Sequence, residues 1–374
     1  MEHPLPATKF PLLLLSLGLA VAGARAEESP PPVRLAIVGL AHDHVRGFLP
    51  QLRGRHDVEL VGIVETDAAL IADVAAKFKL EAKLFYPSIE ALCGKEKVQA
   101  VATFTSTFDH RRVVEECAPR GIPVMMEKPL AVSLDDAKAI ATAARRGGIE
   151  VIVNYETTWY RSAHGAYDLV HGRNAIGDLR KIVVRDGHSG PAKICSDWFL
   201  SWLTDPVLDG GGAVMDFGCY GADLTTWLMD GQRPTSVSAT LQHFQPDVYP
   251  KVDDEATIVL TYPKAQAVIQ ASWNWPHGRK DMDIYGQTGS ARLPDGNTLF
   301  VHGQNGPEQR VDLPVLPLPA GDSISWLVAV ARGQTKSTGL GSLETNLVVN
   351  EILDAAKESA RTGRRIDLPA KPAW

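Results

Sequence analysis

Residues 33–44 read VRLAIVGLAHDH, and this stretch contains the first predicted strand and the loop that follows it. The run 33–38 is almost entirely apolar, as expected of a strand that is buried on both faces of a parallel sheet. Gly39 ends this strand. A helix is predicted to start near His44, and Pro50 must shorten or kink it.

The sequence that follows alternates strand-like and helix-like segments as far as residue 153. Strands are predicted over 58–64, 98–103, 123–126 and 151–154, and helices over 67–78, 109–120 and 134–147. Strands that alternate with helices form parallel sheets with right-handed crossovers. The sequence therefore predicts a doubly wound, Rossmann-type domain over 33–153.

After Tyr155, strand-like segments succeed one another with few helices between them. The predicted strands cover 181–185, 236–244, 256–262, 265–273, 281–285, 291–293 and 299–302, and helices are expected at 162–171, 221–229 and 342–361. This pattern is typical of a large, mostly antiparallel sheet. The predicted fold class is therefore α/β, with a second, α+β domain over 154–374.

Composition narrows the class of protein. The chain has 374 residues, a formal net charge of −6, 45% hydrophobic and 22% charged residues. These values are those of a globular protein and exclude a coiled coil or a collagen-like fibre. The net negative charge argues against a nucleic-acid-binding protein, which usually carries an excess of basic residues.

The first 26 residues are predicted to be a secretory signal peptide. Lys9 precedes an apolar run of 13 residues, 10–22, and Ala24-Arg25-Ala26 is a small-x-small cleavage site. The apolar run is shorter than the about 20 residues of a membrane span. An uncleaved N-terminal anchor is the alternative. Residues 27–32 (EESPPP) form a short linker, and the mature chain is expected to be periplasmic or secreted, with no membrane span.

The loop after the first strand carries part of a dinucleotide-binding motif. A G-x-G-x-x-G pattern would place glycines at 39, 41 and 44, but only Gly39 is present, because Ala41 and His44 occupy the other two positions. Glu65, at the end of the second strand, can accept hydrogen bonds from ribose hydroxyls. If a dinucleotide binds here, Glu65 favours NAD over a cofactor with a 2′-phosphate. The motif alone leaves an equal alternative, a domain that has kept this shape and lost its ligand.

Three downstream motifs carry a resemblance to a known family. They are Thr105-Ser106-Thr107-Phe108-Asp109-His110, Glu127-Lys128-Pro129, and the stretch 210–223, GGGAVMDFGCYGAD. In this order and with the two-domain pattern, the chain resembles the Gfo/Idh/MocA family, the relatives of glucose–fructose oxidoreductase and inositol dehydrogenase. The resemblance implies a nicotinamide at the carboxyl edge of the parallel sheet, a small-molecule carbohydrate or polyol beside the antiparallel sheet, and a homo-oligomer.

The resemblance also implies roles for individual residues. Lys128 and Asp216 match the catalytic lysine and aspartate, and Tyr220 stands where the family has a histidine four residues after that aspartate. Tyrosine can act as a base only where a cation depresses its pKa. The cofactor-binding residues implied are Gly39, Ala41, His42, Glu65, Thr105, His110, Glu127, Lys128 and Pro129, and the substrate-binding candidates are Asn154, Tyr155, Trp198 and Asp223.

Each of these residues also has a structural interpretation. Lys128 could be a solvated turn residue, Asp216 a helix N-cap, and Tyr220 or Trp198 a packed core aromatic.

Two classes of function follow from these observations. The first is an exported oxidoreductase that acts on a carbohydrate with a tightly held NAD, including redox-assisted glycoside cleavage. The second lacks nicotinamide: a metal-assisted lyase or hydrolase, or a sugar-binding protein, on an altered Rossmann scaffold. His42, His44 and His110 are candidate metal ligands for this second class, although the leading interpretation includes no metal site.

Overall fold

The first sheet, sheet A, contains six parallel strands from the N-terminal half of the protein. In this computed structural model, which describes residues 30–372 and 374, the strands are β1 (Val33–Val38), β2 (Val58–Val64), β3 (Phe85–Tyr86), β4 (Ala100–Thr103), β5 (Val124–Glu127) and β6 (Val151–Asn154). Their order is β3-β2-β1-β4-β5-β6, and every neighbouring pair is parallel. The doubly wound fold predicted from the sequence is therefore confirmed. The predicted signal peptide lies outside the described residues.

Helices cover both faces of sheet A. They are α1 (Val45–Gln51), α2 (Ala68–Phe78), α3 (Ile89–Cys93), α4 (His110–Cys117) and α5 (Leu134–Gly147). Side chains cap three of them: Asp67 accepts hydrogen bonds at the start of α2, Ser88 at the start of α3, and Ser133 at the start of α5. The helix α1 is short and contains Pro50, as expected.

The strand β1 shows why its sequence is apolar at consecutive positions. Leu35 and Ile37 belong to the core that contains α1 and α2, whereas Ala36 and Val38 belong to the core that contains α4 and α5. Successive side chains of a strand point to opposite faces, so both faces of β1 are buried.

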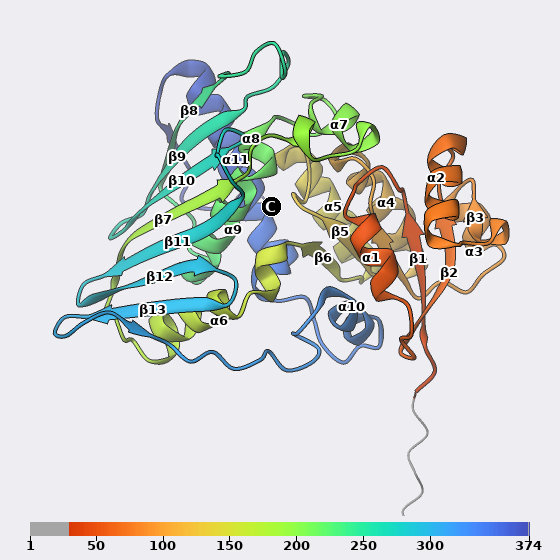
Figure 1. Cartoon of the computed structure of the whole chain (residues 1–374), viewed down its shortest axis with the longest axis horizontal. Coiled ribbons are helices and arrows are strands. Elements are labelled where there is room, and N and C mark those ends of the chain that lie inside the picture. Colours follow the sequence, from red (N-terminus) through yellow and green to blue (C-terminus); the bar gives the residue numbers. More distant parts are fainter. Residues whose placement is uncertain (1–29, 373) are drawn as a thin grey trace, which may run out of the picture. The chain divides into compact units, whose positions relative to one another are not determined.

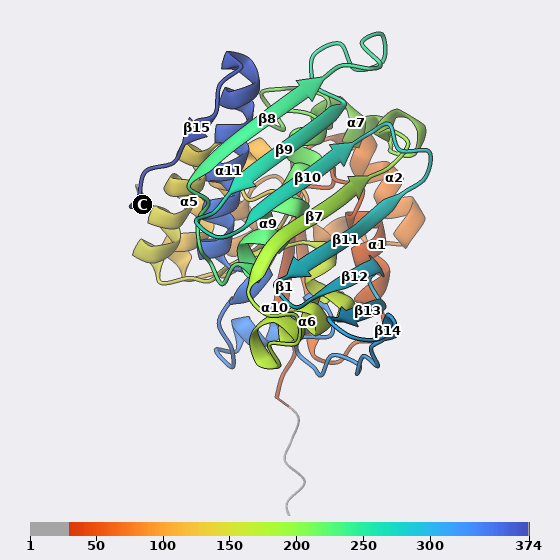
Figure 2. The ribbon, with the colours of Figure 1, turned by 90° about the vertical axis from the view of Figure 1, so that its left-hand side faces the viewer.

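The second sheet, sheet B, contains nine strands. They are β7 (Leu179–Gly187), β8 (Ser236–Gln242), β9 (Glu255–Thr261), β10 (Gln266–Ser272), β11 (Arg279–Gly286), β12 (Gly289–Asp295), β13 (Thr298–Gly303), β14 (Gln309–Arg310) and β15 (Ile366–Asp367), in the order β14-β13-β12-β11-β7-β10-β9-β8-β15. Only the central pair, β7 and β10, is parallel. Sheet B is thus mostly antiparallel, as predicted, and Figure 2 shows its outer face with the helices behind it.

The helices of the C-terminal half lie mainly on the inner face of sheet B. They are α6 (Arg161–Tyr167), α7 (Asp197–Leu203), α8 (Ala213–Asp216), α9 (Gly218–Leu228), α10 (Ser323–Ala331) and α11 (Leu343–Thr362). The helices α9 and α11 pack against strands of sheet B, and α11 also packs against α5 of the first half (Figure 1). None of the described helices is long and apolar enough to cross a membrane.

Three of these helices, α7, α8 and α10, were not predicted from the sequence. Apolar residues of α10, among them Ile324 and Leu327, join the core between sheet A and helices α1 and α2. The chain therefore returns to the first sheet near its C-terminal end, and the body from Pro32 to Trp374 is one compact unit. The domain boundary at 153/154 stays a prediction.

The glycine run that precedes α8 fixes the position of that helix. Asp253 holds the helix start, since its carboxylate accepts hydrogen bonds from the backbone N–H of Gly212, at 3.0 Å, and of Val214, at 2.8 Å. Its carbonyl oxygen accepts from Ala213 at 3.0 Å. The N-terminal end of α8 is therefore held by Asp253 rather than by Asp216, which lies at the other end.

Replacing Gly212 by alanine is expected to destabilise the protein. A Cβ at this position would lie 1.9 Å from the carbonyl oxygen of Asp253, so the backbone must shift. Overpacking of this kind costs about 1–3 kcal/mol in the free energy of unfolding, which urea denaturation measures. Gly303→Ala is the matched control, because a Cβ there meets no atom within 4 Å. Equal stability of the two variants would contradict the role of this close approach.

Candidate active site

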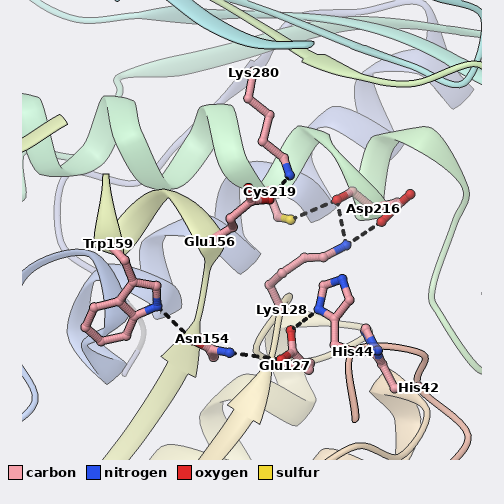
Figure 3. A network of polar contacts seen from close by, with 10 residues as sticks. All are labelled: His42, His44, Glu127, Lys128, Asn154, Glu156, Trp159, Asp216, Cys219 and Lys280. Atoms are coloured by element: carbon pink, nitrogen blue, oxygen red, sulfur yellow. Dashed lines mark hydrogen bonds and ion pairs between the residues drawn. The ribbon is translucent and has the colours of Figure 1, made fainter. Parts of the chain in front are cut away.

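A buried ion pair connects sheet A to the start of the second half. Lys128 follows β5 directly and is 5% exposed, and Asp216, at the end of α8, is 4% exposed. The Lys128 Nζ forms an ion pair with the Asp216 carboxylate and donates a hydrogen bond to the Asp216 carbonyl oxygen at 3.0 Å. The indole N–H of Trp273 donates to the other carboxylate oxygen at 2.9 Å. The Lys128 ammonium is therefore held in one place (Figure 3).

The pair keeps both groups charged. Burial alone would lower the pKa of Lys128, but the Asp216 carboxylate outweighs burial and raises it. Burial alone would raise the pKa of Asp216, and the Lys128 ammonium lowers it instead. An opposite charge at hydrogen-bond distance favours the ionised form of each partner. The site therefore contains a buried cation that remains protonated over the physiological range.

Tyr220 lies beside this cation but does not meet the condition for a base. Helix α8 ends at Asp216 and α9 begins at Gly218, so Asp216 and Tyr220 do not share one helical face as the sequence suggested. The Lys128 Nζ lies 5.4 Å from the centre of the Tyr220 ring. Burial raises the pKa of Tyr220 well above its ordinary value. The phenol is therefore neutral and contributes a ring face to the cation.

A second network begins at Glu127, the last residue of β5. Its Oε2 lies 2.9 Å from the Nδ1 of His44, and its Oε1 accepts a 2.9 Å hydrogen bond from the Asn154 side chain. The Asn154 oxygen in turn accepts from the indole N–H of Trp159 at 3.1 Å. Burial alone would raise the pKa of Glu127, but His44, Asn154 and Lys128 lower it. Glu127 is thus an oriented, buried carboxylate (Figure 3).

The loop between β1 and α1 adopts the shape of a dinucleotide loop. Gly39 has a φ of +79°, and a Cβ there would lie 2.5 Å from the Cγ2 of Thr105, so only glycine allows this approach. Glu65 accepts a hydrogen bond from the backbone N–H of Leu40 at 3.0 Å. Glu65 therefore lies at the position predicted for it and is tied to the loop.

The helix α7 covers this loop. The Asp43 carboxylate accepts hydrogen bonds from the backbone N–H and the hydroxyl of Ser196, at 2.7 and 2.6 Å, and the Trp202 indole donates to the carbonyl oxygen of Ala41. Trp198, on the same helix, lies near Arg46. Trp198 thus belongs to the helix that covers the loop. It lines neither of the two cavities that meet at Glu156.

Two predicted histidines are buried next to the loop. The His42 ring packs against Phe199 and Trp202, and the Nδ1 accepts a 3.2 Å hydrogen bond from the backbone N–H of His44. His110 Nδ1 donates to the carbonyl oxygen of Leu130. Burial lowers the pKa of His42 well below its ordinary value and that of His110 to about 4, so both rings are neutral.

Two cavities meet at Glu156. One, of about 570 Å³, is lined by Asp43, His44, Glu127, Asn154, Glu156 and Trp159 among others. The other, of about 750 Å³, lies against strands β7, β11 and β12 of sheet B and includes Glu156, Tyr160, His188, Phe217 and Lys280. Glu156 forms an ion pair with Lys280, whose Nζ lies 4.8 Å from the Tyr220 ring centre. The cavities flank the charged residues of the site.

Two of the predicted substrate-binding residues are fully buried. Tyr155 is fully buried and its hydroxyl donates to Asn346 at 2.9 Å. Asp223 is fully buried, and burial raises its pKa well above the ordinary value. Their role as substrate contacts stays a prediction.

Asn154 does line a cavity, as do three residues that sequence reasoning missed, Glu156, Trp159 and Lys280. The only local signal for Lys280 was its position two residues before the buried Met282, on the same face of β11.

Comparison with known proteins gives a match to each half of the chain. Residues 33–155 match the oxidoreductase family with an NAD-binding Rossmann fold, GFO_IDH_MocA, and residues 169–292 match the GFO/IDH/MocA C-terminal domain. A D-apiose dehydrogenase from Rhizobium rhizogenes is 26% identical over 350 residues, which cover 86% of this chain and 94% of that protein.

A dTDP-3,4-didehydro-2,6-dideoxy-alpha-D-glucose 3-reductase from Streptomyces antibioticus is 29% identical over 190 residues. This alignment covers 51% of this chain and 55% of that protein, so the chain spans about half the length of this relative. The solved structure of an inositol dehydrogenase homolog from Azotobacter vinelandii, complexed with NAD+, has a TM-score of 0.77 at 19% identity and covers 90% of this chain and 98% of that one. It shares the fold.

The residues of the loop fit a dinucleotide in most respects. The left-handed Gly39, its close approach to Thr105 and the carboxylate of Glu65 are the features that such a loop requires. The departures are Ala41 and His44, which add side chains where glycines are usual.

Asp209 gives the site a measurable pH dependence. This residue is buried behind the ion pair, accepts a 2.8 Å hydrogen bond from Thr107, and burial together with Asp216 raises its pKa to about 8. The pKa of an aspartate in an unfolded chain is about 3.9. Between these two pH values the folded protein binds the extra proton, so this carboxyl makes the protein less stable as pH rises from about 4 to about 8.

Asp209→Asn is therefore expected to flatten the decline of unfolding free energy between pH 5 and pH 8, measured by urea denaturation at several pH values. The exposed Asp247→Asn is the control and should leave the slope unchanged. A slope that is the same in wild type and in Asp209→Asn would refute the assignment.

Proposed function

The chain belongs to the Gfo/Idh/MocA family of oxidoreductases, and we propose that it transfers a hydride between a tightly held NAD and a hydroxyl-bearing carbon of a carbohydrate or polyol. The observation that carries this proposal is the buried, charged Lys128 at the carboxyl edge of sheet A, paired with Asp216. Sugar dehydrogenases among the relatives support the substrate class. When bound, NAD supplies the hydride acceptor.

The ion pair supports a specific role for Lys128. As a hydroxyl carbon is oxidised, negative charge develops on its oxygen, and a fixed, buried cationic donor stabilises that charge. Asp216 and Trp273 hold the ammonium in place, so it does not reorganise during the reaction. In the reverse direction the same ammonium donates to the carbonyl oxygen that is reduced.

The residues that would hold the cofactor lie along one edge of sheet A. Gly39 allows the backbone to approach the cofactor closely, and Glu65 can accept hydrogen bonds from ribose. Thr105 lies just after β4, and Glu127 is the last residue of β5. The helix α7 is hydrogen-bonded to this loop through Asp43 and Ala41. A covered loop favours slow release, which suits a cycle that oxidises and re-reduces one sugar, including redox-assisted glycoside cleavage.

Native mass spectrometry of the purified mature protein is expected to show one NAD retained by each chain. Lys128→Met should keep that cofactor and lose turnover by about 10²-fold or more, because the developing charge loses its donor. Turnover is followed by nicotinamide absorbance with D-glucose, D-xylose and myo-inositol as probes. Lys264→Met, at an exposed hairpin turn, is the control. A protein that neither retains nor binds added NAD would rule out the proposal, as would full activity of Lys128→Met.

We also propose that the chain is exported, on the strength of the apolar run 10–22 and the cleavage site Ala24-Arg25-Ala26. The mature chain is then expected to begin at Glu27. N-terminal sequencing of the protein from the periplasm or culture medium tests this expectation. A chain recovered only from the cytoplasm, with Met1 or Glu2 at its N-terminus, would contradict it.

A further inference from the structure

The loop that departs from the dinucleotide motif brings three metal-ligating side chains together. His42 and His44 come from the loop, and Glu127 comes from the end of β5. One ligand atom of each lies within 4.8 Å of those of the other two. Two imidazoles and one carboxylate form the ligand set of several zinc and non-haem iron sites. We propose that these three residues bind a divalent first-row transition metal ion.

The local structure turns the two histidines toward the same side. Asp43, between them, is held away by its hydrogen bonds to Ser196 and its ion pair with Arg46. The rings of His42 and His44 are 4.5 Å apart, centre to centre. His110 is not in the group, so the third ligand is Glu127 rather than the third histidine that the sequence suggested.

The surroundings of the group suit a cation. The Nε2 of His42 is buried without a partner among the described residues. The Glu127 carboxylate is buried at the same place, and imidazole nitrogen and carboxylate oxygen are common metal ligands. The nearby Lys128 ammonium is already paired with Asp216, which reduces its repulsion of a cation.

The carboxylate is also oriented as metal ligands usually are. Asn154 holds Glu127 Oε1, and Trp159 holds Asn154, so Oε2 is the oxygen left for the ion (Figure 3). Outer hydrogen bonds of this kind fix a ligand's direction and raise metal affinity. The Glu127 Oε2 lies 2.9 Å from His44 Nδ1. Two ligand atoms at this distance can share a proton or bind the same metal ion.

Binding requires a small adjustment, and His44 is the residue that can provide it. Bonds of about 2.1 Å allow ligand atoms to lie at most about 4.2 Å apart, so the group must close slightly. Ligation through His42 Nε2 also places the ring proton on Nδ1, which opens the 3.2 Å hydrogen bond from the His44 N–H. The His44 side chain is 51% exposed and lies in the loop before α1, so its ring can move.

Three protein ligands leave coordination positions open. His44 and Glu127 line the 570 Å³ cavity, so these positions face a space that water or a substrate hydroxyl can enter. A metal ion makes a bound hydroxyl more acidic. The ion would therefore activate a hydroxyl oxygen close to Lys128, a role that Tyr220 as a neutral phenol does not fill.

The test is metal binding itself, measured on the mature protein after removal of metals with a chelator. Isothermal titration with Zn²⁺ is expected to show one tight site, and His44→Ala and Glu127→Gln should each weaken it by about 10-fold or more. His302→Ala, an exposed histidine on β13, is the matched control and should bind as wild type does. Because His42 is buried and its loss could unfold the chain, the half-exposed His44 is the primary variant.

Two results would overturn the proposal. One is the absence of a one-to-one Zn²⁺ site in the wild type, with Mn²⁺ also failing to bind. The other is equal affinity in wild type, His44→Ala and Glu127→Gln, provided circular dichroism shows that the variants are folded. Neither result depends on NAD, so failure of the metal site and failure of the proposed oxidoreductase activity are separate outcomes.

Discussion

The ion pair between Lys128 and Asp216 is the interaction on which the site depends. It joins the carboxyl edge of sheet A to helix α8, and α8 is itself fixed by Asp253 at its start and by Trp273 at its end. Removing one partner of a buried pair leaves an uncompensated charge, at a cost of about 3–5 kcal/mol. The two sheets are therefore linked at the point where the proposed chemistry takes place.

The altered glycine loop has a different set of partners from those that its sequence suggests. A carboxylate at Asp43 would repel a pyrophosphate, but Ser196 and Arg46 engage it and connect the loop to α7. His44, in place of a glycine, reaches across to Glu127. The side chains that weaken the nucleotide motif thus build a polar network of their own, and this network is the basis of the metal proposal.

Much of the fold could be predicted from the sequence, because periodicity and capping are local signals. The apolar run of β1 and the caps of α2 and α5 each depend on neighbouring residues. The polar contacts of the candidate site could be predicted only in part. Glu156 and Lys280 are 124 residues apart in the sequence, so no local pattern predicts their ion pair. The burial of Tyr155 and Asp223 could not be predicted either, because proximity to a motif does not show whether a side chain is exposed.

The return of α10 to the first sheet has a consequence for folding. Ile324 and Leu327 complete a core whose other members begin at Val33, so that core stays open until almost the whole polypeptide has been synthesised. Contacts this distant in sequence slow folding, because a long loop must close before they form. The first sheet therefore reaches its final packing only after a segment near the C-terminal end has docked on it.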